Sequence, residues 1–403
     1  MTGRVSDAGL PLDGVRVLDF SRLLPGPWAT QMLADMGADV IKVEHVEGGD
    51  PSRHNPPMAG DTSVYFRSVN GGKRSLALDL RAEPSKAVIR RLFGLSDIVF
   101  ESFSVGTADR LGVGYRDARA LRPDVIYCSI SGYGQDGPRS SVSGHDLIIQ
   151  ATSGILSPQP GSLPHFQAGD YSAASMATIA VLAALRQRDA SGEGGHLDIS
   201  MADSLVAMGA IALGPGLARA AGFPGEPRIE VWGANPRYAI YPTVDGRTVA
   251  VCLLEARLWR AFCEAIGRLD LASEDERPEQ RHSSHGARGE EFRSAIASWC
   301  AARTAAEIDA VMRPLGLPVA AVATADEAVS DLHNRQRGII AQGDAGSTPI
   351  LANPLARAGL ARPERSAAPA LGEHNHAILA ELGLNNERGH IAPSQGEDAR
   401  TES

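Results

Sequence analysis

Residues 15–130 alternate short apolar runs with segments that repeat their apolar positions every three or four residues. The apolar runs are rich in β-branched residues and too short for helices, which predicts buried strands at residues 15–20, 38–44, 75–80, 97–100 and 124–130. Helices are predicted between them at residues 28–36, 84–93 and 115–121. Strands that alternate with helices indicate βαβ units, so we expect a parallel sheet with helices on both faces.

Loops rich in glycine and serine follow these strands. Ser131-Gly132-Tyr133-Gly134, for example, comes directly after the predicted strand 124–130. In open parallel sheets, ligands bind at the carboxyl ends of the strands. We therefore expect a binding site among these loops.

The pattern changes beyond residue 237. Two short apolar runs, 238–241 and 249–251, flank Asp245-Gly246, which predicts a β-hairpin with an Asp-Gly turn. Further helices are predicted at residues 258–266, 289–302 and 375–382. The expected organisation is a large domain begun by residues 10–205, a linker at 206–224, a small domain at 225–330, a return segment at 331–386 that completes the large domain, and a polar, disordered tail at 387–403.

Composition narrows the class of protein. The 403 residues include 39 basic and 48 acidic ones, a net charge of −9, which argues against nucleic acid as a partner. The four cysteines form no metal-binding or disulfide pattern. The N-terminus lacks a signal region, and the longest apolar run, 173–185, is too short to span a membrane, so we expect a cytoplasmic protein without a membrane partner.

Two residues stand out as candidate proton-handling groups. His145 and Asp170 each follow a glycine and each precede a segment that is predicted to be helical. An imidazole and a carboxylate are well suited to moving a proton near neutral pH, although an aspartate before a helix also serves as a simple N-cap. At a helix N-terminus the free N–H groups would favour an ionised Asp170, able to act as a base or as a nucleophile.

Three common catalytic signatures are missing. No GxGxxG follows the first strand, and no GxxxxGK[ST] occurs, which disfavours a dinucleotide or P-loop site. Ser129-Ile130-Ser131-Gly132 lacks the leading glycine of a serine-hydrolase elbow.

Several motifs together resemble the family III CoA-transferases, also called the CaiB/BaiF family. They are LDGVRVLDF at residues 12–20, PGP at 25–27, LADMGADVIKVE at 33–44, NGGKRS at 70–75, SGYGQDGP at 131–138 and LGEH at 371–374. The resemblance extends from about residue 12 to residue 384, and the motifs occur in the order of the family.

The resemblance implies an α/β enzyme that acts on acyl-CoA thioesters. Its large domain would be Rossmann-like and built from both ends of the chain, its smaller domain would be α+β, and two chains would interlock as a homodimer. In the transferases, the aspartate matched by Asp170 attacks the thioester, forming a mixed anhydride and then an enzyme thioester. In members that racemise 2-methylacyl-CoA, this aspartate and a histidine matched by His145 act as two bases on opposite faces of Cα. The helix N–H groups near Asp170 would then support the enolate oxygen.

Site residues separate the two branches of the family. Gly-His-Asp around His145 and the match of Glu255 to a racemase glutamate favour racemisation, as does the lack of a polyglycine lid around residues 232–234. One departure points the other way, because Ser104 stands where racemases carry an arginine in Glu-x-Phe-Arg-Pro-Gly.

The resemblance also implies a set of CoA contacts. These are Leu78, Asp79, Leu80, Arg81, Ser102, Phe103, Arg110, Ser131, Gly132, Tyr133, Gly144 and Asp146. Arg81 and Arg110 would pair with phosphates, although each could equally be a solvated surface charge. Trp232 and Tyr238 would line the pocket for the acyl group or lie at a domain interface. Phe103 could equally belong to the hydrophobic core.

The first interpretation is therefore a 2-methylacyl-CoA racemase that uses Asp170, His145 and Glu255. The alternative is a CoA-transferase that moves CoA between an acyl-CoA and a free carboxylic acid through Asp170. A CoA-binding protein without catalysis is a third possibility. Coenzyme A would enter as part of the substrate, and neither a metal nor a permanently bound cofactor is expected.

Overall fold

The structure is a computed structural model that describes residues 9–156, 165–225, 234–273, 276–277, 283–341, 348–355, 359–360 and 366–384. The chain divides into two compact units, which we describe separately. The first comprises Met1–Ser153, Gly161–Met208 and Leu332–Ser403, and the second Gly154–Pro160 and Gly209–Asp331. The tail predicted at residues 387–403 lies outside the described residues.

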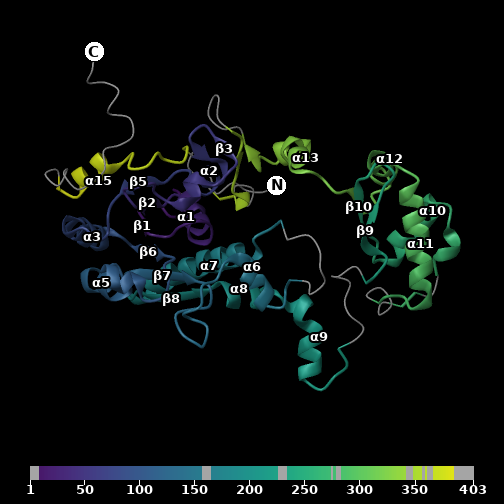
Figure 1. Ribbon diagram of the computed structural model, residues 1–403, viewed down its shortest axis with the longest axis horizontal. Coiled ribbons are helices and arrows are strands. Elements are labelled where there is room, and N and C mark those ends of the chain that lie inside the picture. The colour runs from purple at the N-terminus through teal and green to yellow at the C-terminus, as the bar shows by residue number, and fades with distance from the viewer. Residues whose placement is uncertain are drawn as a thin grey trace, which may run out of the picture. The chain divides into compact units, whose positions relative to one another are not determined.

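A six-stranded parallel sheet forms the centre of the first unit (Figure 1). Its order is β5 (Arg74–Ala77), β2 (Asp39–Glu44), β1 (Arg16–Asp19), β6 (Ile98–Glu101), β7 (Ile126–Ser131) and β8 (Gly195–Ser200). The predicted α/β class with a parallel sheet is confirmed, and each of the five predicted strands is present. The sixth strand, β8, was not predicted because its sequence, GHLDIS, lacks the continuous apolar run by which the other strands were identified.

Helices and short strands complete the first unit. The helices are α1 (Pro25–Asp35), α2 (Val64–Asn70), α3 (Glu83–Leu95), α4 (Thr107–Leu111), α5 (Tyr115–Leu121), α6 (Asp146–Thr152), α7 (Ala168–Ser191), α8 (Met201–Met208), α14 (Leu332–Gln336) and α15 (Asn375–Glu381), with a 3-10 turn at Pro51–His54. Two short strand pairs are β3 (Met58–Ala59) with β4 (Thr62–Ser63), and β12 (Ile340–Ala341) with β13 (Ile350–Leu351).

The order in which the chain adds strands reverses at the middle of the sheet, although all strands remain parallel. From β1 the chain proceeds through β2 to β5 on one side, and β6, β7 and β8 follow on the other. The loops that leave β1 and β6 therefore run to opposite sides of the sheet. Such a switch point opens a crevice at the carboxyl ends of the two strands, where ligands of parallel sheets bind.

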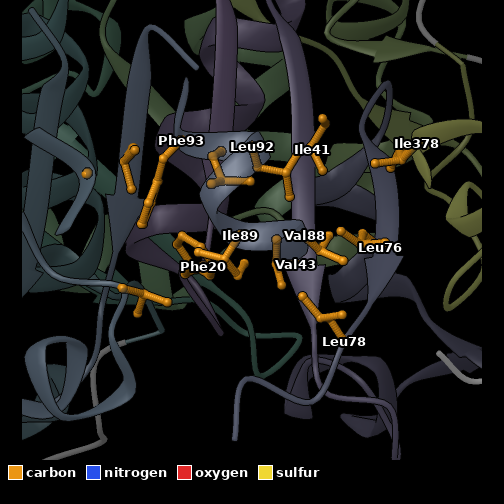
Figure 2. Packing of buried hydrophobic residues seen from close by; sticks show 14 of the residues in the cluster. Phe20, Ile41, Val43, Leu76, Leu78, Val88, Ile89, Leu92, Phe93 and Ile378 are labelled. Carbon is orange, nitrogen blue, oxygen red and sulfur yellow. The ribbon is translucent and has the colours of Figure 1, made fainter. Parts of the chain in front are cut away.

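One face of the sheet carries the hydrophobic core. Alternate strand residues, such as Ile41, Val43 and Leu76, pack with residues of α3 and α15 (Figure 2). Leu18 on β1 and Ala118 on α5 belong to the same cluster. Burial of these side chains is the main source of stability for the first unit. The amphipathic pattern that predicted helix 84–93 reflects this packing.

The other face of the same strands carries buried charges. Asp19, Lys42 and Glu44 occupy the alternate positions of β1 and β2, and all three are buried. Lys42 Nζ lies 2.9 Å from Asp50 Oδ2, with both side chains 0% exposed, and also donates to the Ser21 carbonyl at 2.8 Å. We call Asp19, Lys42, Asp50 and Lys73 the buried ion network.

Lys73 completes this network. Its ammonium lies 3.2 Å from Asp19 Oδ2 and also donates to Thr30 Oγ1 and Asn70 Oδ1. Burial would raise the pKa of Asp19, but the charges of Lys73 and Lys42 outweigh it and lower that pKa. Burial dominates at Lys73 itself and lowers its pKa to about 8. All four charges are thus paired and hydrogen-bonded, the condition for ions to persist in a protein interior.

The C-terminal segment closes one edge of the sheet. The Ala77 N–H on β5 donates to Asn375 Oδ1 at 2.9 Å, and the Ser75 N–H donates to His374 Nδ1 at 3.2 Å. The carbonyl of Pro369 accepts from the buried Arg53 guanidinium at 3.1 Å. The LGEH motif at 371–374 is thus a structural clasp on β5.

The second unit is built around a small antiparallel sheet. Its strands are β11 (Val319–Ala321), β10 (Thr248–Cys252) and β9 (Tyr238–Pro242), in that order, and β9 and β10 form the predicted hairpin. Its helices are α9 (Ala210–Ala220), α10 (Ala256–Ala265), α11 (Ala287–Ala301), α12 (Ala305–Met312) and α13 (Ala325–Ser330), with a 3-10 turn at Leu269–Leu271. The expected linker at 206–224 is instead largely helical, because its alanines and leucines favour the end of α8 and all of α9.

Helix α7 is long and apolar. By length and composition alone it could cross a membrane, and α8 with α9 meets the same test only as a pair bent by 82°. Gly169, Ala173 and Val181 on α7 are buried, and the helix packs along α1, α8 and the sheet. The apolar run predicted at 173–185 is accounted for by this packing.

The buried ion network yields a stability prediction. Lys42→Met removes the cation beside Asp50 and Asp19 and should lower the free energy of unfolding by about 3–5 kcal/mol, because two buried carboxylates lose their partner. Urea unfolding followed by circular dichroism measures this loss.

Lys86→Met is the matched control. Lys86 pairs with Glu83 on the surface of α3, with side chains 60% and 82% exposed, and the substitution should change stability by less than about 0.5 kcal/mol. Equal effects of the two substitutions would contradict a structural role for the network.

Candidate active site

A cavity of about 830 Å³ opens in the first unit at the carboxyl edge of the sheet. Its walls come from the loops after β1, β6 and β7, at residues 22–25, 102–105 and 130–132, together with residues 140–145 and the start of α7. These are the loops of the switch point, so the cavity lies where the topology predicts a ligand.

Asp170 lies in the wall of this cavity, on the first turn of α7. Burial, followed by the negative charge of Asp146, raises its pKa from 3.8 to about 7. The expectation that the helix N-terminus keeps Asp170 fully ionised is therefore wrong. Near neutral pH this carboxyl group exists in both protonation states.

The reason is that Asp146 occupies the end of the helix. Asp146 Oδ1 accepts the N–H of Gly169 at 2.7 Å and that of Asp170 at 3.4 Å, while Gln150 holds Oδ2 at 2.7 Å. Asp146 is thus the carboxylate that the N-terminus of α7 stabilises. It also places a negative charge beside the carboxyl group of Asp170. Asp146 is not among the residues that line the cavity, so its effect on Asp170 is electrostatic.

His145 lines the same cavity as Asp170. It is the exposed N-cap residue of α6, and its loop is fixed by a close approach of two glycines. A Cβ on Gly132 would lie 3.1 Å from the Gly144 Cα, and a Cβ on Gly144 would lie 3.1 Å from the Gly132 Cα. The absence of side chains at both positions therefore lets the loop of His145 sit directly against the end of β7.

The loop after β1 brings a residue that the sequence analysis missed. Arg22 lines the cavity, and its guanidinium carbon lies 5.3 Å from the centre of the Phe103 ring. Little in the sequence selects Arg22 as a site residue, because it lies in a segment after the predicted strand 15–20 that is typical of a turn. Only its place just after the β1 carboxyl end could have suggested a site residue.

Aromatic side chains form another part of the wall. Tyr65 on α2 and Tyr171 on α7 both line the cavity, and Tyr171 contacts Trp28 edge to face with ring centres 5.5 Å apart. Burial, followed by the charges of Asp50 and Asp170, raises the pKa of Tyr65. The Tyr65 hydroxyl therefore stays protonated and can donate a hydrogen bond within the cavity.

The residues predicted to contact CoA separate into two groups. Those that line the cavity are Ser102, Phe103, Ser131, Gly132 and Gly144, with Ser104 beside them. Leu78 is buried in the hydrophobic core and Leu80 packs against that core. Five others also do not line the cavity. Asp79 accepts the Arg81 N–H, Arg110 donates to Thr107, and the Tyr133 hydroxyl contacts Thr152. Arg81 itself and Asp146 are the remaining two.

Three further predicted residues lie elsewhere in the chain. Glu255 is an exposed N-cap residue of α10 in the second unit, and Tyr238 is an exposed residue of β9 in the same unit. Trp232 falls outside the described residues. Within the part of the chain that the structure describes, no cluster of three or more His, Cys, Asp or Glu residues could hold a metal ion.

Comparisons with known proteins identify the family of this chain. The sequence profile of CoA-transferase family III matches residues 12–375. The chain is 32% identical over 391 residues to a succinate–glutarate CoA-transferase of Agrobacterium fabrum, covering 92% of this chain and 96% of that protein. It is 33% identical over 397 residues to a succinyl-CoA:mesaconate CoA-transferase of Haloarcula marismortui, covering 93% and 97%.

A solved structure is also similar. The crystal structure of a CaiB/BaiF family protein from Brucella suis superposes with a TM-score of 0.79 at 28% identity, over 93% of this chain and 100% of that one. The comparisons thus identify the class of protein as an enzyme of a CoA-transferase family. The chain belongs to CoA-transferase family III.

The same comparisons bear on the two branches of the family. The relatives named above are CoA-transferases, and they give no support to the first interpretation, a 2-methylacyl-CoA racemase. Gly-His-Asp at His145 and the glutamate at 255 were therefore insufficient grounds for assigning the reaction.

The raised pKa of Asp170 predicts a pH-dependent stability. A carboxyl whose pKa is raised by folding stabilises the protein fully below about 3.8 and loses that contribution as the pH rises through about 7. Asp170→Asn cannot ionise and should gain on the order of 1 kcal/mol relative to the unsubstituted protein between pH 5 and pH 8. Urea midpoints across this range measure the gain.

Asp146→Asn supplies the control background. Without the charge of Asp146, the pKa of Asp170 falls, so the relative gain from Asp170→Asn should shrink. A gain that is independent of pH in both backgrounds would show that Asp170 does not titrate in this range.

Proposed function

We propose that this enzyme transfers CoA from an acyl-CoA to a free carboxylic acid, with Asp170 as the nucleophile. The observation that carries the proposal is a partly buried carboxylate in the wall of a cavity large enough for part of a CoA thioester. The names of the two relatives support it, since each names CoA transfer to or from a carboxylic acid.

The proposed reaction proceeds through two anhydrides. Asp170 attacks the thioester carbonyl carbon, the C–S bond breaks, and CoA leaves as a thiolate. The thiolate then attacks the Asp170 carboxyl carbon, releases the donor acid as a carboxylate and leaves CoA bound to Asp170 as a thioester. The acceptor carboxylate attacks this thioester and expels the thiolate, which adds to the acceptor acyl carbon and restores Asp170. No oxidant and no net proton are needed.

A pKa of about 7 suits this role for Asp170. The nucleophilicity of an oxygen anion increases with its basicity, yet a group with this pKa is still largely ionised slightly above neutral pH. The burial that raises the pKa also removes water from a thioester and an anhydride that water would hydrolyse.

One contact weighs against racemisation. The N–H groups of Gly169 and Asp170 were the expected support for an enolate oxygen, but both donate to Asp146. An enolate next to Asp170 would therefore lack these two donors. Transfer needs no enolate, so the same geometry is compatible with it.

The test follows an isotopic label from a free acid into acyl-CoA. Labelled succinate should enter the CoA thioester pool when the enzyme is given succinyl-CoA, and Asp170→Ala should reduce this exchange by a factor on the order of 10⁴ or more. His145→Ala should reduce it by only about tenfold. Asp189→Ala, which alters an exposed carboxylate at the far end of α7, serves as the control and should leave exchange unchanged.

Two additional measurements separate the alternatives. Hydroxylamine should trap an acyl group on the peptide that contains Asp170 during turnover. Incubation of a 2-methylacyl-CoA in heavy water should leave Cα without deuterium. Rapid exchange at Cα without movement of the label would restore the racemase, and retention of CoA without either reaction would indicate a binding protein.

We also propose that the enzyme is a homodimer. Helix α9 buries none of its residues, and Ile211 and Leu217 on it are 55% and 64% exposed, as is Phe223 at 68% just beyond it. Several large apolar side chains left exposed on and beside one helix are typical of a protein interface.

Light scattering should therefore give twice the mass of one chain. The double substitution Ile211→Asp and Leu217→Asp should convert the dimer to monomer, because each aspartate would have to be buried at the interface. A monomeric unsubstituted protein at micromolar concentration would refute the dimer.

A further inference from the structure

We propose that Arg22 binds a second carboxylate of the substrate acid, so that the enzyme selects dicarboxylic acids over monocarboxylic acids. This inference rests on the proposed function, since it names the class of acid that the transfer uses. The reacting carboxylate would face Asp170, and the distal carboxylate would pair with the guanidinium of Arg22.

The backbone around Arg22 is anchored on both sides. The N–H of Arg22 donates to Ser102 Oγ at 3.0 Å. The preceding residue, Ser21, donates its N–H to Asp19 Oδ1 at 2.9 Å and accepts from Lys42 Nζ at 2.8 Å. The following residue, Leu23, donates its N–H to Asp50 Oδ1 at 3.2 Å. Three members of the buried ion network thus hold the loop in place.

The same loop carries backbone strain. Leu23 has φ +63°, a left-handed conformation that is unfavourable for a branched side chain. A Cβ on Gly26 would lie only 2.1 Å from the Ser21 Cβ, so the turn also requires glycine at that position. Strain of this kind persists where the surrounding structure imposes it, and it gathers at ligand sites.

The guanidinium itself is directed by aromatic contact. It lies over the Phe103 ring at 5.3 Å, and Phe103 is fixed because its N–H donates to Glu101 Oε2 at 2.7 Å. Stacking on a ring leaves the in-plane N–H donors of an arginine free for a carboxylate. In the described part of the chain, no carboxylate forms an ion pair with Arg22.

The charge of the cavity wall favours the same ligand. Arg22 is the only arginine or lysine among the residues described as lining the cavity, and Asp170 is the only acidic one. A cation in the same wall as the nucleophile matches an acid with two carboxylates.

A phosphate of CoA could supply the same negative charge from another source. A pyrophosphate usually engages several donors at once, whereas a single planar guanidinium fits one carboxylate in bidentate fashion. The described lining has one such fork. The carboxylate is therefore the better match, and the phosphate becomes an outcome of the test.

The test compares acids matched in chain length. Succinate and butyrate have four carbons and differ in one carboxylate, so we would measure kcat/KM for each as acceptor, with the unsubstituted enzyme, Arg22→Gln and Arg22→Lys. Arg22→Gln should lower kcat/KM for succinate by about 10- to 100-fold while changing the value for butyrate by less than about threefold. Arg22→Lys should recover part of the loss, because the charge remains but the fork does not.

Arg119→Gln is the matched control. The Arg119 guanidinium also lies over an aromatic ring, 5.9 Å from the centre of Tyr115, but Arg119 does not line the cavity. It should leave the succinate-to-butyrate ratio unchanged. Equal loss for both acids in Arg22→Gln, or a loss that appears as weaker binding of free CoA in calorimetry, would overturn the inference and assign Arg22 to phosphate or to structure.

Direct binding keeps this result separate from the proposed function. Calorimetric titration of succinate and butyrate into the full-length protein needs no turnover. Binding of succinate that depends on Arg22, without exchange of label, would retain the dicarboxylate site and reject the transferase. Exchange of label with no preference for succinate over butyrate would retain the transferase and reject the dicarboxylate site.

Discussion

The pairing of Lys42 with Asp50, on the face of the sheet opposite the cluster of Leu18, Ile41 and Leu76, is the contact on which the rest of the site depends. Lys42 sits on β2 and Asp50 in the loop beyond it, yet both reach back to the loop after β1. A protein would gain as much stability from well-packed hydrophobic side chains at these positions. The ions instead give the loop hydrogen-bond partners of defined direction, which apolar side chains cannot supply.

A second constraint is competition for the end of one helix. Two aspartates lie near the N-terminus of α7, and only one of them can accept its N–H groups. Asp146 accepts them, so Asp170 is left with burial and a neighbouring negative charge. The N–H groups of α7 therefore do not lower the pKa of Asp170, which burial and the charge of Asp146 raise instead. Assigning roles to carboxylates at a helix end requires knowing which one is the cap.

Much of the first unit could be predicted from the sequence. Apolar runs such as 15–20 and 38–44 are largely buried strands, so their composition alone identifies them. In the second unit, the hairpin at 238–251 follows from one Asp-Gly turn. Strand β8 was missed because, as a partly exposed edge strand, it has only two apolar residues and no continuous apolar run. Helix α9 was missed because Pro215, flanked by Gly214 and Gly216, lies inside it and is typical of a loop.

The site was harder to predict. His145 and Asp170 were found from residue type and flanking glycines, and they do share a cavity. Arg22, in contrast, is defined by the two strands whose loops meet above the switch point, and a linear sequence does not show that residues 22 and 103 are neighbours. The pKa of Asp170 was also beyond the sequence, because it depends on which groups Asp146 contacts.

The clasp of the C-terminal segment on β5 has a consequence for biosynthesis. During translation the strands of the six-stranded sheet can emerge and pair well before Pro369, His374 and Asn375 leave the ribosome. Until then β5 is an open edge with unpaired N–H groups, and Arg53 lacks one acceptor. A nascent chain in this state is open to pairing with another strand, so a segment that is made long after β5 is the one that protects this edge of the sheet from aggregation.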